Sequence, residues 1–387
     1  MVLDEGVDPD AVAAYHEGFA GISVVHRYRH ALNGYAAEVS TPGSLSAIKA
    51  DARVDFVSAD RVFRTTAQTL PTGINRIDGE LSSTASGNGS GSVNINVAVI
   101  DTGIDLSHPD LNVVGQKTCV PGTLNANDLN GHGSHVAGTI AAKDDANGVV
   151  GVAPGARLYA VKVLTDAGVG LTTDIICGID WVTSTRTDLD PSNNIAVANM
   201  SIGGGGTDDS NCGNSNNDAY HKAICNSTNA GVTHVVAAGN DSVDFRSTAP
   251  ATYGEVLTVT AISDFNGAPG GGAAPTCRSD VDDTEANYSN WAVLAADQNH
   301  TIAAPGTCIN STYMLGGYNT ISGTSMASPH VAGVAALCIA TGACTGTPAQ
   351  IIQKLRADAQ SYTTANPGYG FTSPSGRYYG SLTRASY

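Results

Sequence analysis

The chain has 387 residues, of which 42% are hydrophobic and only 14% are charged, so it can bury a large core and carries no signature of disorder. A formal net charge of −16 argues against nucleic acid or an anionic membrane as a partner, because both bind clusters of Lys and Arg. No apolar run approaches the roughly 18 to 20 residues that span a bilayer. We therefore expect a globular monomer without a nucleic-acid or membrane partner.

Residues 1–66 form a cysteine-free segment that we interpret as a small module. Apolar patches at residues 22–25 and 36–39 and helical stretches near residues 9–19 and 44–51 fit a βαββαβ order. This pattern predicts a small α+β domain of ferredoxin-like topology. The first five residues lack the charged and apolar regions of a signal peptide.

From residue 93 onward, apolar strand candidates alternate with helical patterns. The strand candidates are 93–100, 157–164, 195–200, 232–238 and 255–262, and the helical patterns are 133–142, 172–184, 215–228 and 325–341. Such alternation predicts an α/β fold with a parallel sheet covered by helices on both faces. A further helix is expected over 347–362, and the Tyr- and Gly-rich stretch 366–387 is expected to be a covering extension.

The stretch Gly-Thr-Ser-Met-Ala-Ser-Pro-His, from Gly323 to His330, places Ser325 at a junction between a glycine and a helix. Glycine lets the backbone turn sharply, and the residues that follow have the apolar spacing of a buried helix. The free N–H groups and the dipole at a helix start favour an oxyanion beside the serine. Taken alone, Ser325 is more simply explained as a helix cap.

Two upstream segments change that interpretation. An apolar run from Val97 ends on the carboxylate of Asp101, and His132 stands directly before a helical pattern. Asp-Thr-Gly also occurs in aspartic proteases, but those need two such carboxylates, and the sequence holds no second Asp-Thr-Gly or Asp-Ser-Gly. An Asp at a strand end followed by a His and a Ser at helix starts is the order in which subtilisin carries the serine triad.

With these motifs the chain resembles the subtilases, the subtilisin-like serine endopeptidases, from about Ala67 to Leu355. The resemblance rests on Asp-Thr-Gly-Ile-Asp, His-Pro-Asp-Leu, His-Gly-Ser-His-Val-Ala-Gly-Thr, Gly-Val-Ala-Pro-Gly-Ala, Asn-Met-Ser-Ile-Gly-Gly, Ala-Ala-Gly-Asn and Gly-Thr-Ser-Met-Ala-Ser-Pro-His, in this order. The resemblance implies a subtilisin-like fold with a parallel sheet. It also implies that Ser325 is the nucleophile, His132 the general base and acid, and Asp101 the carboxylate that fixes the imidazole tautomer. Asn240 resembles the oxyanion-hole donor, with a simple turn residue as the alternative.

The resemblance also implies where a peptide substrate binds, as an extra strand between two backbone edges. One edge is Ser201, Ile202 and Gly203, and the other is Gly168, Val169 and Gly170. Thr172, Ile175 and Ile202 resemble an apolar pocket for the fourth residue before the cut. Thr248 resembles the floor of the pocket for the residue next to the cut, which it would narrow.

A structural calcium site is implied as well. Its ligands would be the side chains of Gln68, Asp110 and Asp145 and the backbone oxygens of Lys143, Asn147 and Val149. A solvated acidic loop is the alternative. Residues 264–287 have no evident subtilisin counterpart, and their acidic residues could form a second calcium site or a solvated cluster: Asp280, Asp282, Asp283 and Glu285.

Eight cysteines without C-x-x-C or zinc-finger spacing suggest disulfides made in an oxidising compartment, and hence a secreted, extracellular protein. The pairs closest in sequence are Cys212 with Cys225 and Cys338 with Cys344. The resemblance favours Cys119 with Cys177 and Cys277 with Cys308. Buried free thiols are the alternative for each pair.

Residues 1–66 resemble the propeptide inhibitor domain of subtilases, and residues 67–387 the catalytic domain. The resemblance implies a zymogen that cuts itself between Thr66 and Ala67 and keeps the cleaved segment bound as an inhibitor. Phe63 and Thr66 would enter the two substrate pockets. Cleavage would also free Gln68 to reach the calcium loop.

Three competing interpretations remain weaker. A degenerate subtilase that only binds peptides would lack a triad or oxyanion residue, and none is missing. An esterase or lipase of the α/β-hydrolase type would carry G-x-S-x-G and the order Ser, Asp, His, which this chain lacks. His135 and His330 compete with His132 as the base, but both follow helix starts, where packing is the usual reason for a histidine.

Overall fold

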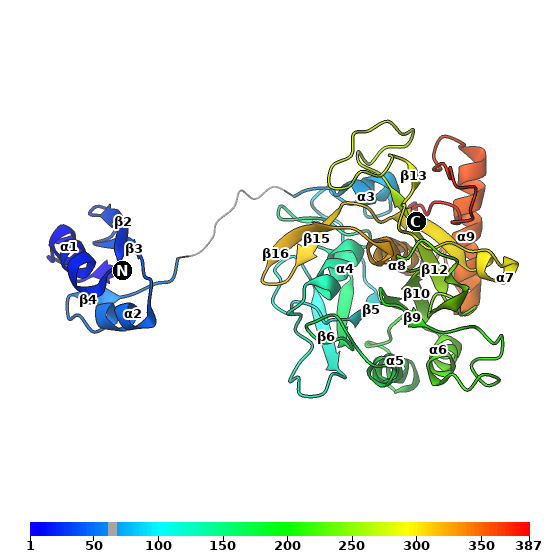
Figure 1. Cartoon of the computed structure of the whole chain (residues 1–387), viewed down its shortest axis with the longest axis horizontal. Coiled ribbons are helices and arrows are strands. Elements are labelled where there is room, and N and C mark those ends of the chain that lie inside the picture. The colour runs from blue at the N-terminus through cyan, green and yellow to red at the C-terminus, as the bar shows by residue number, and fades with distance from the viewer. Residues whose placement is uncertain (61–67) are drawn as a thin grey trace. The chain divides into compact units, whose positions relative to one another are not determined.

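A computed structural model describes residues 1–60 and 68–387 (Figure 1). The chain divides into two compact units, Met1–Thr65 and Thr66–Tyr387. The predicted cut between Thr66 and Ala67, and Phe63 with it, lies outside the described residues. None of the described helices is long and apolar enough to cross a membrane.

The first unit is a four-stranded antiparallel sheet with two helices. Its elements are β1 (Val2–Leu3), α1 (Pro9–Ala20), β2 (Ser23–Tyr28), β3 (Gly34–Glu38), α2 (Pro42–Lys49) and β4 (Val54–Phe56). Along the chain these elements have the expected βαββαβ order, and the strands pair in the order β2-β3-β1-β4. Each helix begins with a polar cap followed by proline, because the side chains of Asp8 and Thr41 accept free backbone N–H groups.

The second unit is built on a mainly parallel sheet, which confirms the predicted α/β class. Its strands are β5 (Asn96–Asp101), β6 (Val113–Thr118), β7 (Arg157–Lys162), β8 (Val197–Met200), β10 (Thr233–Ala237), β12 (Leu257–Ser263), β13 (Thr284–Glu285) and β14 (Thr301–Pro305). They pair in the order β13-β12-β10-β8-β5-β7-β6, and β14 pairs with β12. The pair β12–β13 is antiparallel and the others are parallel.

Helices cover both faces of this sheet (Figure 1). One face carries α4 (His132–Ala141), α8 (Thr324–Ala340) and α9 (Pro348–Ala365), and the other carries α5 (Thr172–Thr187) and α6 (Ala219–Asn229). Residues of β5 alternate between the two layers, since Val97 and Val99 pack with the first set of helices and Ala98 and Ile100 with the second. A strand that is buried on both faces consists mainly of apolar residues, so β5 could be predicted from the apolar run in the sequence.

Shorter elements complete this unit. They are α3 (Thr72–Arg76), η1 (Gly79–Leu81), β9 (Gly204–Gly205), η2 (Phe245–Ser247), β11 (Thr248–Ala249), α7 (Ala295–Gln298), β15 (Ile309–Tyr313) and β16 (Gly317–Ile321). Sequence analysis missed β6, β14 and the β15–β16 hairpin. The hairpin carries polar residues because its hydroxyls bind the backbone of α4: Ser311 donates to the oxygen of His135, and Thr312 to that of Ser134.

Four disulfides join the cysteines in the predicted pairs, and these predictions are confirmed. The pairs are Cys119–Cys177, Cys212–Cys225, Cys277–Cys308 and Cys338–Cys344. The first ties the loop after β6 to α5, and the third ties the 264–287 loop to the start of the hairpin. The extension 366–387 packs on the same unit through buried residues such as Leu382 and Ala385, as expected.

Three of the four acidic residues predicted to cluster in the 264–287 loop are buried and Glu285 is partly exposed, so the prediction of a solvated cluster is wrong for the three aspartates. Asp280, Asp282 and Asp283 are no more than 5% exposed, and each accepts backbone N–H groups of the same loop. Arg76, which is 1% exposed, pairs with Asp283 at 2.7 Å and donates to two backbone oxygens near the C-terminus. These carboxylates have the contacts of residues that fix a loop.

Candidate active site

Asp101 and His132 meet at the carboxyl end of the parallel sheet. Asp101 is the last residue of β5 and is fully buried, and His132 is the first residue of α4. The Nδ1–H group of His132 donates to Oδ1 of Asp101 at 2.8 Å. Gly131 precedes the helix with φ +100°, and a side chain there would collide with the ring of Tyr313. Glycine is therefore required where the chain turns into the histidine.

The charge of Asp101 governs the protonation of His132. Burial of the ring acts to lower the pKa of His132, but the charge of Asp101 and its hydrogen bond outweigh burial and hold the pKa above its ordinary value. Because Nδ1 is engaged by Asp101, Nε2 is the nitrogen available to accept a proton. The side chain is 27% exposed, so this nitrogen is accessible.

Asp128, which sequence analysis did not single out, holds the start of α4. Its carboxylate is 1% exposed and accepts the backbone N–H groups of Gly131 and Ser134 and the hydroxyls of Thr102 and Ser134. Thr102 follows Asp101 directly, so one carboxylate joins the strand end to the helix start. An Asp shortly before a predicted helix is the signal that could have revealed this role.

Ser325 is the second residue of α8, at the expected junction between glycine and helix. Its hydroxyl donates to the backbone oxygen of Ser201 at 3.2 Å, and the hydroxyl of Ser201 donates to the backbone oxygen of Ser325 at 2.8 Å. The Ser325 hydroxyl thus bonds to Ser201 and not to His132 in this structure. Ser201 and His132 line one cavity, and catalytic hydrogen bonds of this kind often align only when substrate is bound.

Asn240 follows β10 and reaches the start of α8. Its Oδ1 accepts the backbone N–H of Thr324 at 2.8 Å and the hydroxyl of Thr324 at 3.0 Å. These donors assign the oxygen of the amide and leave Nδ2 as the free donor end. A Cβ placed on Gly323 would lie 3.5 Å from Nδ2 of Asn240 and 3.7 Å from the backbone nitrogen of Ser325, so both donors border the same space.

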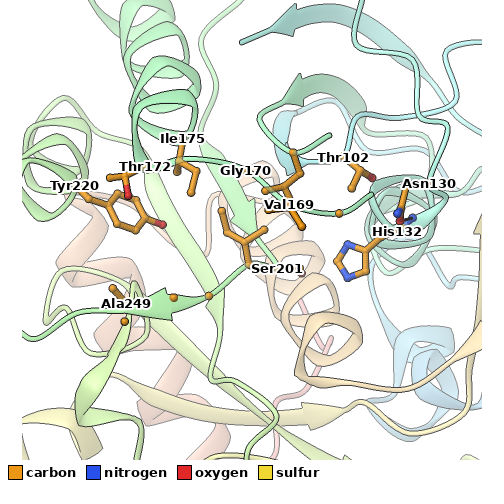
Figure 2. Close-up of a pocket in the computed structure, with 16 residues that line it drawn as sticks. Thr102, Asn130, His132, Val169, Gly170, Thr172, Ile175, Ser201, Tyr220 and Ala249 are labelled. Atoms are coloured by element: carbon orange, nitrogen blue, oxygen red, sulfur yellow. Dashed lines mark hydrogen bonds between the residues drawn. The ribbon is translucent and has the colours of Figure 1, made fainter. Parts of the chain in front are cut away.

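A cavity of about 500 Å³ is lined by His132 and Ser201 (Figure 2). It is lined by both predicted backbone edges and by the predicted pocket residues: Gly168, Val169, Gly170, Thr172, Ile175, Ser201, Ile202 and Gly203. In Figure 2, His132 lies at one end of the cavity and Tyr220 at the other, with Ser201 between them. Tyr220 from α6 and Ala249 from β11 are lining residues that the sequence analysis missed.

Thr248, in β11, borders the predicted substrate edge 201–203. The antiparallel pair β9–β11 places Thr248 opposite Gly205. Its methyl carbon would lie 3.6 Å from a Cβ on Gly203 and 3.5 Å from a Cβ on Gly239. The methyl group therefore lies between these two glycines, beside the loop that carries Asn240.

The two competing histidines are fully buried. His135 donates through Nε2 to the backbone oxygen of Ile309, and Nδ1 of His330 bonds to the backbone oxygen of Met326. Burial lowers the pKa of His135 to about 3 and that of His330 to about 4. Both rings are therefore neutral near pH 7, and their contacts are those of packed structural residues.

The residues predicted to bind calcium lie together. Nε2 of Gln68 donates to the backbone oxygens of Lys143 at 2.9 Å and Val149 at 3.4 Å. Asp110 is 2% exposed, and its Oδ2 accepts the N–H of Val149 at 3.1 Å. Oε1 of Gln68 and Oδ1 of Asp110 are buried without a hydrogen-bond partner. The pKa of Asp110 is raised to about 6. Burial is the main cause of this rise, and the nearby charge of Asp145 adds to it.

Gln68 already lies on this loop in the uncut chain. The backbone N–H of Thr69 donates to the oxygen of Gly148 at 2.8 Å, and Thr69 forms a parallel bridge with Val149. The backbone of Asn147 donates to Oδ1 of Asp145 at 2.7 Å. The prediction that cleavage is needed to bring Gln68 to the loop is therefore wrong, because pairing of the neighbouring residue is sufficient.

A further ionisable cluster surrounds His221 in α6, whose ring is fully buried. Nε2 of His221 bonds to Glu255 at 2.9 Å and lies 3.7 Å from Asp208, and Nδ1 lies 3.4 Å from Asp209. Burial acts to lower the pKa of His221, but the hydrogen bond with Glu255 and the charges of the three carboxylates raise it above its ordinary value. Asp209 also accepts backbone N–H groups of its own loop, so the cluster fixes the chain that follows β9.

Comparison with known proteins identifies the family. Residues 92–372 match the Subtilase family. Subtilisin E of Bacillus subtilis (strain 168) is 37% identical over 328 residues, which cover 84% of this chain and 75% of that protein. Subtilisin DY of Bacillus licheniformis is 38% identical over 276 residues, which cover 70% of this chain and 85% of that protein.

A solved structure shares the fold. The crystal structure of a cold adapted subtilisin-like serine proteinase matches with a TM-score of 0.61 at 30% identity, over 82% of this chain and 98% of that chain. The chain therefore belongs to the subtilase family, and it is a serine endopeptidase that acts on peptide substrates.

Proposed function

We propose that this subtilase is a secreted endopeptidase whose catalytic triad is Asp101, His132 and Ser325. Ser325 attacks the peptide carbonyl while Nε2 of His132 takes its proton, and His132 then protonates the leaving amine. Asp101 holds the ring in the required tautomer and stabilises the imidazolium. The observation that carries the proposal is the 2.8 Å bond from Asp101 to a histidine that lines the same cavity as Ser201, the hydrogen-bond partner of Ser325.

In this proposal the oxyanion of the tetrahedral intermediate is held by two donors. One is Nδ2 of Asn240, and the other is the backbone N–H of Ser325 at the start of α8, where the helix dipole also favours negative charge. Removing the side chain in Asn240→Ala should lower kcat by about 10²- to 10³-fold, because the donor acts mainly on charge that develops in the transition state.

The substrate would bind in extended form between the edges 168–170 and 201–203. Glycines in both edges allow close approach of a peptide backbone. Ile175, Ile202 and Tyr220 give the far end of the cavity an apolar character, which supports an apolar fourth residue before the cut. Thr248 would limit the size of the residue next to the cut, since its methyl group lies between two glycines of the site.

Ser325→Ala tests the catalytic assignment. The variant should lose casein hydrolysis and labelling by a fluorophosphonate, whereas Ser83→Ala, at an exposed serine, should retain both. Unchanged labelling of Ser325→Ala would refute the assignment. A panel of short-chain esters separates a peptidase from an esterase, because a chain that cleaves esters but no casein would contradict the proposed function.

We further propose that the first unit is a propeptide, which the enzyme cuts from itself between Thr66 and Ala67 and which then stays bound as an inhibitor. The unit has a core of its own around Leu3, Val12 and Ile48, which supports an independently folded inhibitor. Intact-mass analysis should show the wild type cut at this bond and Ser325→Ala whole. A pure Ser325→Ala chain that still cleaves would defeat self-processing.

We also propose a structural Ca²⁺ held by Gln68, Asp110 and Asp145, together with the backbone oxygens of Lys143, Asn147 and Val149. The residues fit the ion, since two of the side-chain oxygens are buried without any partner and oxygen donors are those that Ca²⁺ prefers. Chelation should then lower the melting temperature. The four disulfides support secretion into an oxidising compartment.

A further inference from the structure

The loop that carries Asn240 is clamped by Asn290, a fully buried residue in the segment that follows β13. Nδ2 of Asn290 donates to the backbone oxygen of Ala238 at 3.0 Å. Its Oδ1 accepts the backbone N–H groups of Asp241 at 3.0 Å and Val243 at 3.1 Å. The side chain of Asn290 thus binds the backbone on both sides of Asn240.

Backbone contacts extend the same clamp. The N–H of Asn290 donates to the oxygen of Gly239 at 3.0 Å, and the N–H of Gly239 donates to the hydroxyl of Thr324 at 3.1 Å. Gly239 has φ +102°, and a side chain there would collide with the amide of Asn290. The residue before Asn240 is therefore held between Asn290 and Thr324 and cannot be larger than glycine.

Asn290 and Thr324 fix different parts of Asn240. Thr324 binds the oxygen of the Asn240 side chain, whereas Asn290 binds the backbone of the residues on either side of Asn240. The direction of Nδ2 depends on both anchors because the side chain is short. A donor acts on a developing oxyanion only at close range, so a displacement of about 1 Å is enough to cost much of its effect.

We propose that Asn290 is a positioning residue for the oxyanion hole: it fixes the backbone of Asn240 so that Nδ2 points at the transition-state oxyanion. This inference rests on the proposed role of Asn240. Asn290 is fully buried and is not among the residues that line the cavity, so it acts through Asn240 and not on the bound substrate. Loss of the clamp should therefore lower kcat and leave KM nearly unchanged.

Asn290→Asp tests the inference with little change of shape. The carboxylate keeps an acceptor for the N–H groups of Asp241 and Val243 but places an oxygen against the oxygen of Ala238. With a peptide anilide as substrate, we expect kcat to fall by about 10- to 100-fold and KM to change by less than about 3-fold. Rates are normalised to the active sites that a fluorophosphonate titrates.

Asn96→Asp is the matched control. Asn96 is 3% exposed, and its Nδ2 also binds two backbone oxygens, but it lies at the amino end of β5, away from the active-site end of the sheet. This variant loses the two bonds from Nδ2 but keeps an acceptor for Arg157, and its kcat should be unchanged whatever the change in its melting temperature. If Asn290 mattered only for stability, Asn290→Asp would also leave kcat unchanged.

A double-mutant cycle separates positioning from stability. In an Asn240→Ala background, Asn290→Asp should lower kcat by less than about 2-fold, because no amide remains to be misplaced, while the loss in melting temperature persists. An equal fall of kcat in both backgrounds, or a wild-type kcat for Asn290→Asp alone, would overturn the inference. If Asn290→Asp does not fold, Asn290→Ser is judged by the same criteria. A wild-type rate for Asn240→Ala would instead refute the proposed oxyanion role and remove the residue through which Asn290 acts.

Discussion

The substitution Asp110→Asn should raise the stability of the calcium-free protein and lower that of the calcium-loaded protein. Asp110 is buried with one oxygen, Oδ1, that has no partner, and its other oxygen accepts the N–H of Val149 and the hydroxyl of Tyr318. An asparagine keeps an oxygen for these two donors and removes the buried charge. Without a cation the charge destabilises the fold, and with a cation it is a ligand.

The raised pKa of Asp110 sets the magnitude. Burial is the main reason that this pKa rises from 3.8 to about 6 in the folded chain. A rise of about 2 pH units at about 1.36 kcal/mol per unit gives about 3 kcal/mol, and screening by solvent at the loop reduces the expected effect to about 1–2 kcal/mol. Because the folded pKa lies above the unfolded one, stability falls as pH rises from about 4 to 6, and the full penalty of ionised Asp110 is present at higher pH.

With calcium bound, the wild type should be more stable than Asp110→Asn. An ion that binds only the folded chain at about 1,000 times its Kd stabilises it by about 4 kcal/mol, and most of this gain should be lost when a charged ligand becomes an amide. Melting curves near pH 8 with calcium and with chelator supply the test, in a Ser325→Ala background that prevents self-digestion. Asp180→Asn, at an exposed carboxylate of α5, is the control and should change neither curve appreciably. Equal calcium-induced shifts with and without Asp110→Asn, or a lower melting temperature of Asp110→Asn in chelator, would refute the reasoning.

Other predictions concern the ionisable groups of the second unit. Asp101→Asn should lower kcat by about 10⁴-fold and move the acid limb of the kcat/KM profile to lower pH, because the charge that raises the pKa of His132 is removed; an unmoved limb would contradict this origin of the shift. The raised pKa of His221 means that its ion pairs stabilise the protein fully below about pH 6.5 and less as pH rises through the folded pKa. Denaturant midpoints at about pH 5.5 and about pH 8.5 should then reveal a smaller pH-dependent loss in His221→Gln than in the wild type. Arg76→Met should destabilise by about 3–5 kcal/mol in guanidinium unfolding because it leaves Asp283 buried without its cation, and adding Asp283→Asn should recover part of that loss.

Local patterns in the sequence were sufficient to predict the parallel sheet with helices on both faces, and to select the candidate catalytic residues. The strands β5, β8 and β10 are buried on both faces, so most of their residues are apolar. Asp101, His132 and Ser325 each stand where such a run ends or where a glycine opens a helix, and these marks are visible within a few residues. The β15–β16 hairpin was missed because its polar residues follow no apolar pattern and bind the backbone of α4. The strand β14 was missed because its apolar stretch, Ile302–Ala304, is only three residues long.

The contacts that orient the site were decided only by the tertiary structure. Thr324 binds the side chain of Asn240 from 84 residues away, and the bonds from Asn290 to the same loop span 47 to 52 residues. Arg76 forms a buried ion pair with Asp283, which lies 207 residues away in the sequence. From the sequence alone, Asp283 was a candidate for a calcium site or a solvated cluster. A polar side chain that binds a distant backbone or charge leaves no periodic signal, because its partner is chosen by how the elements pack and not by its neighbours in the chain.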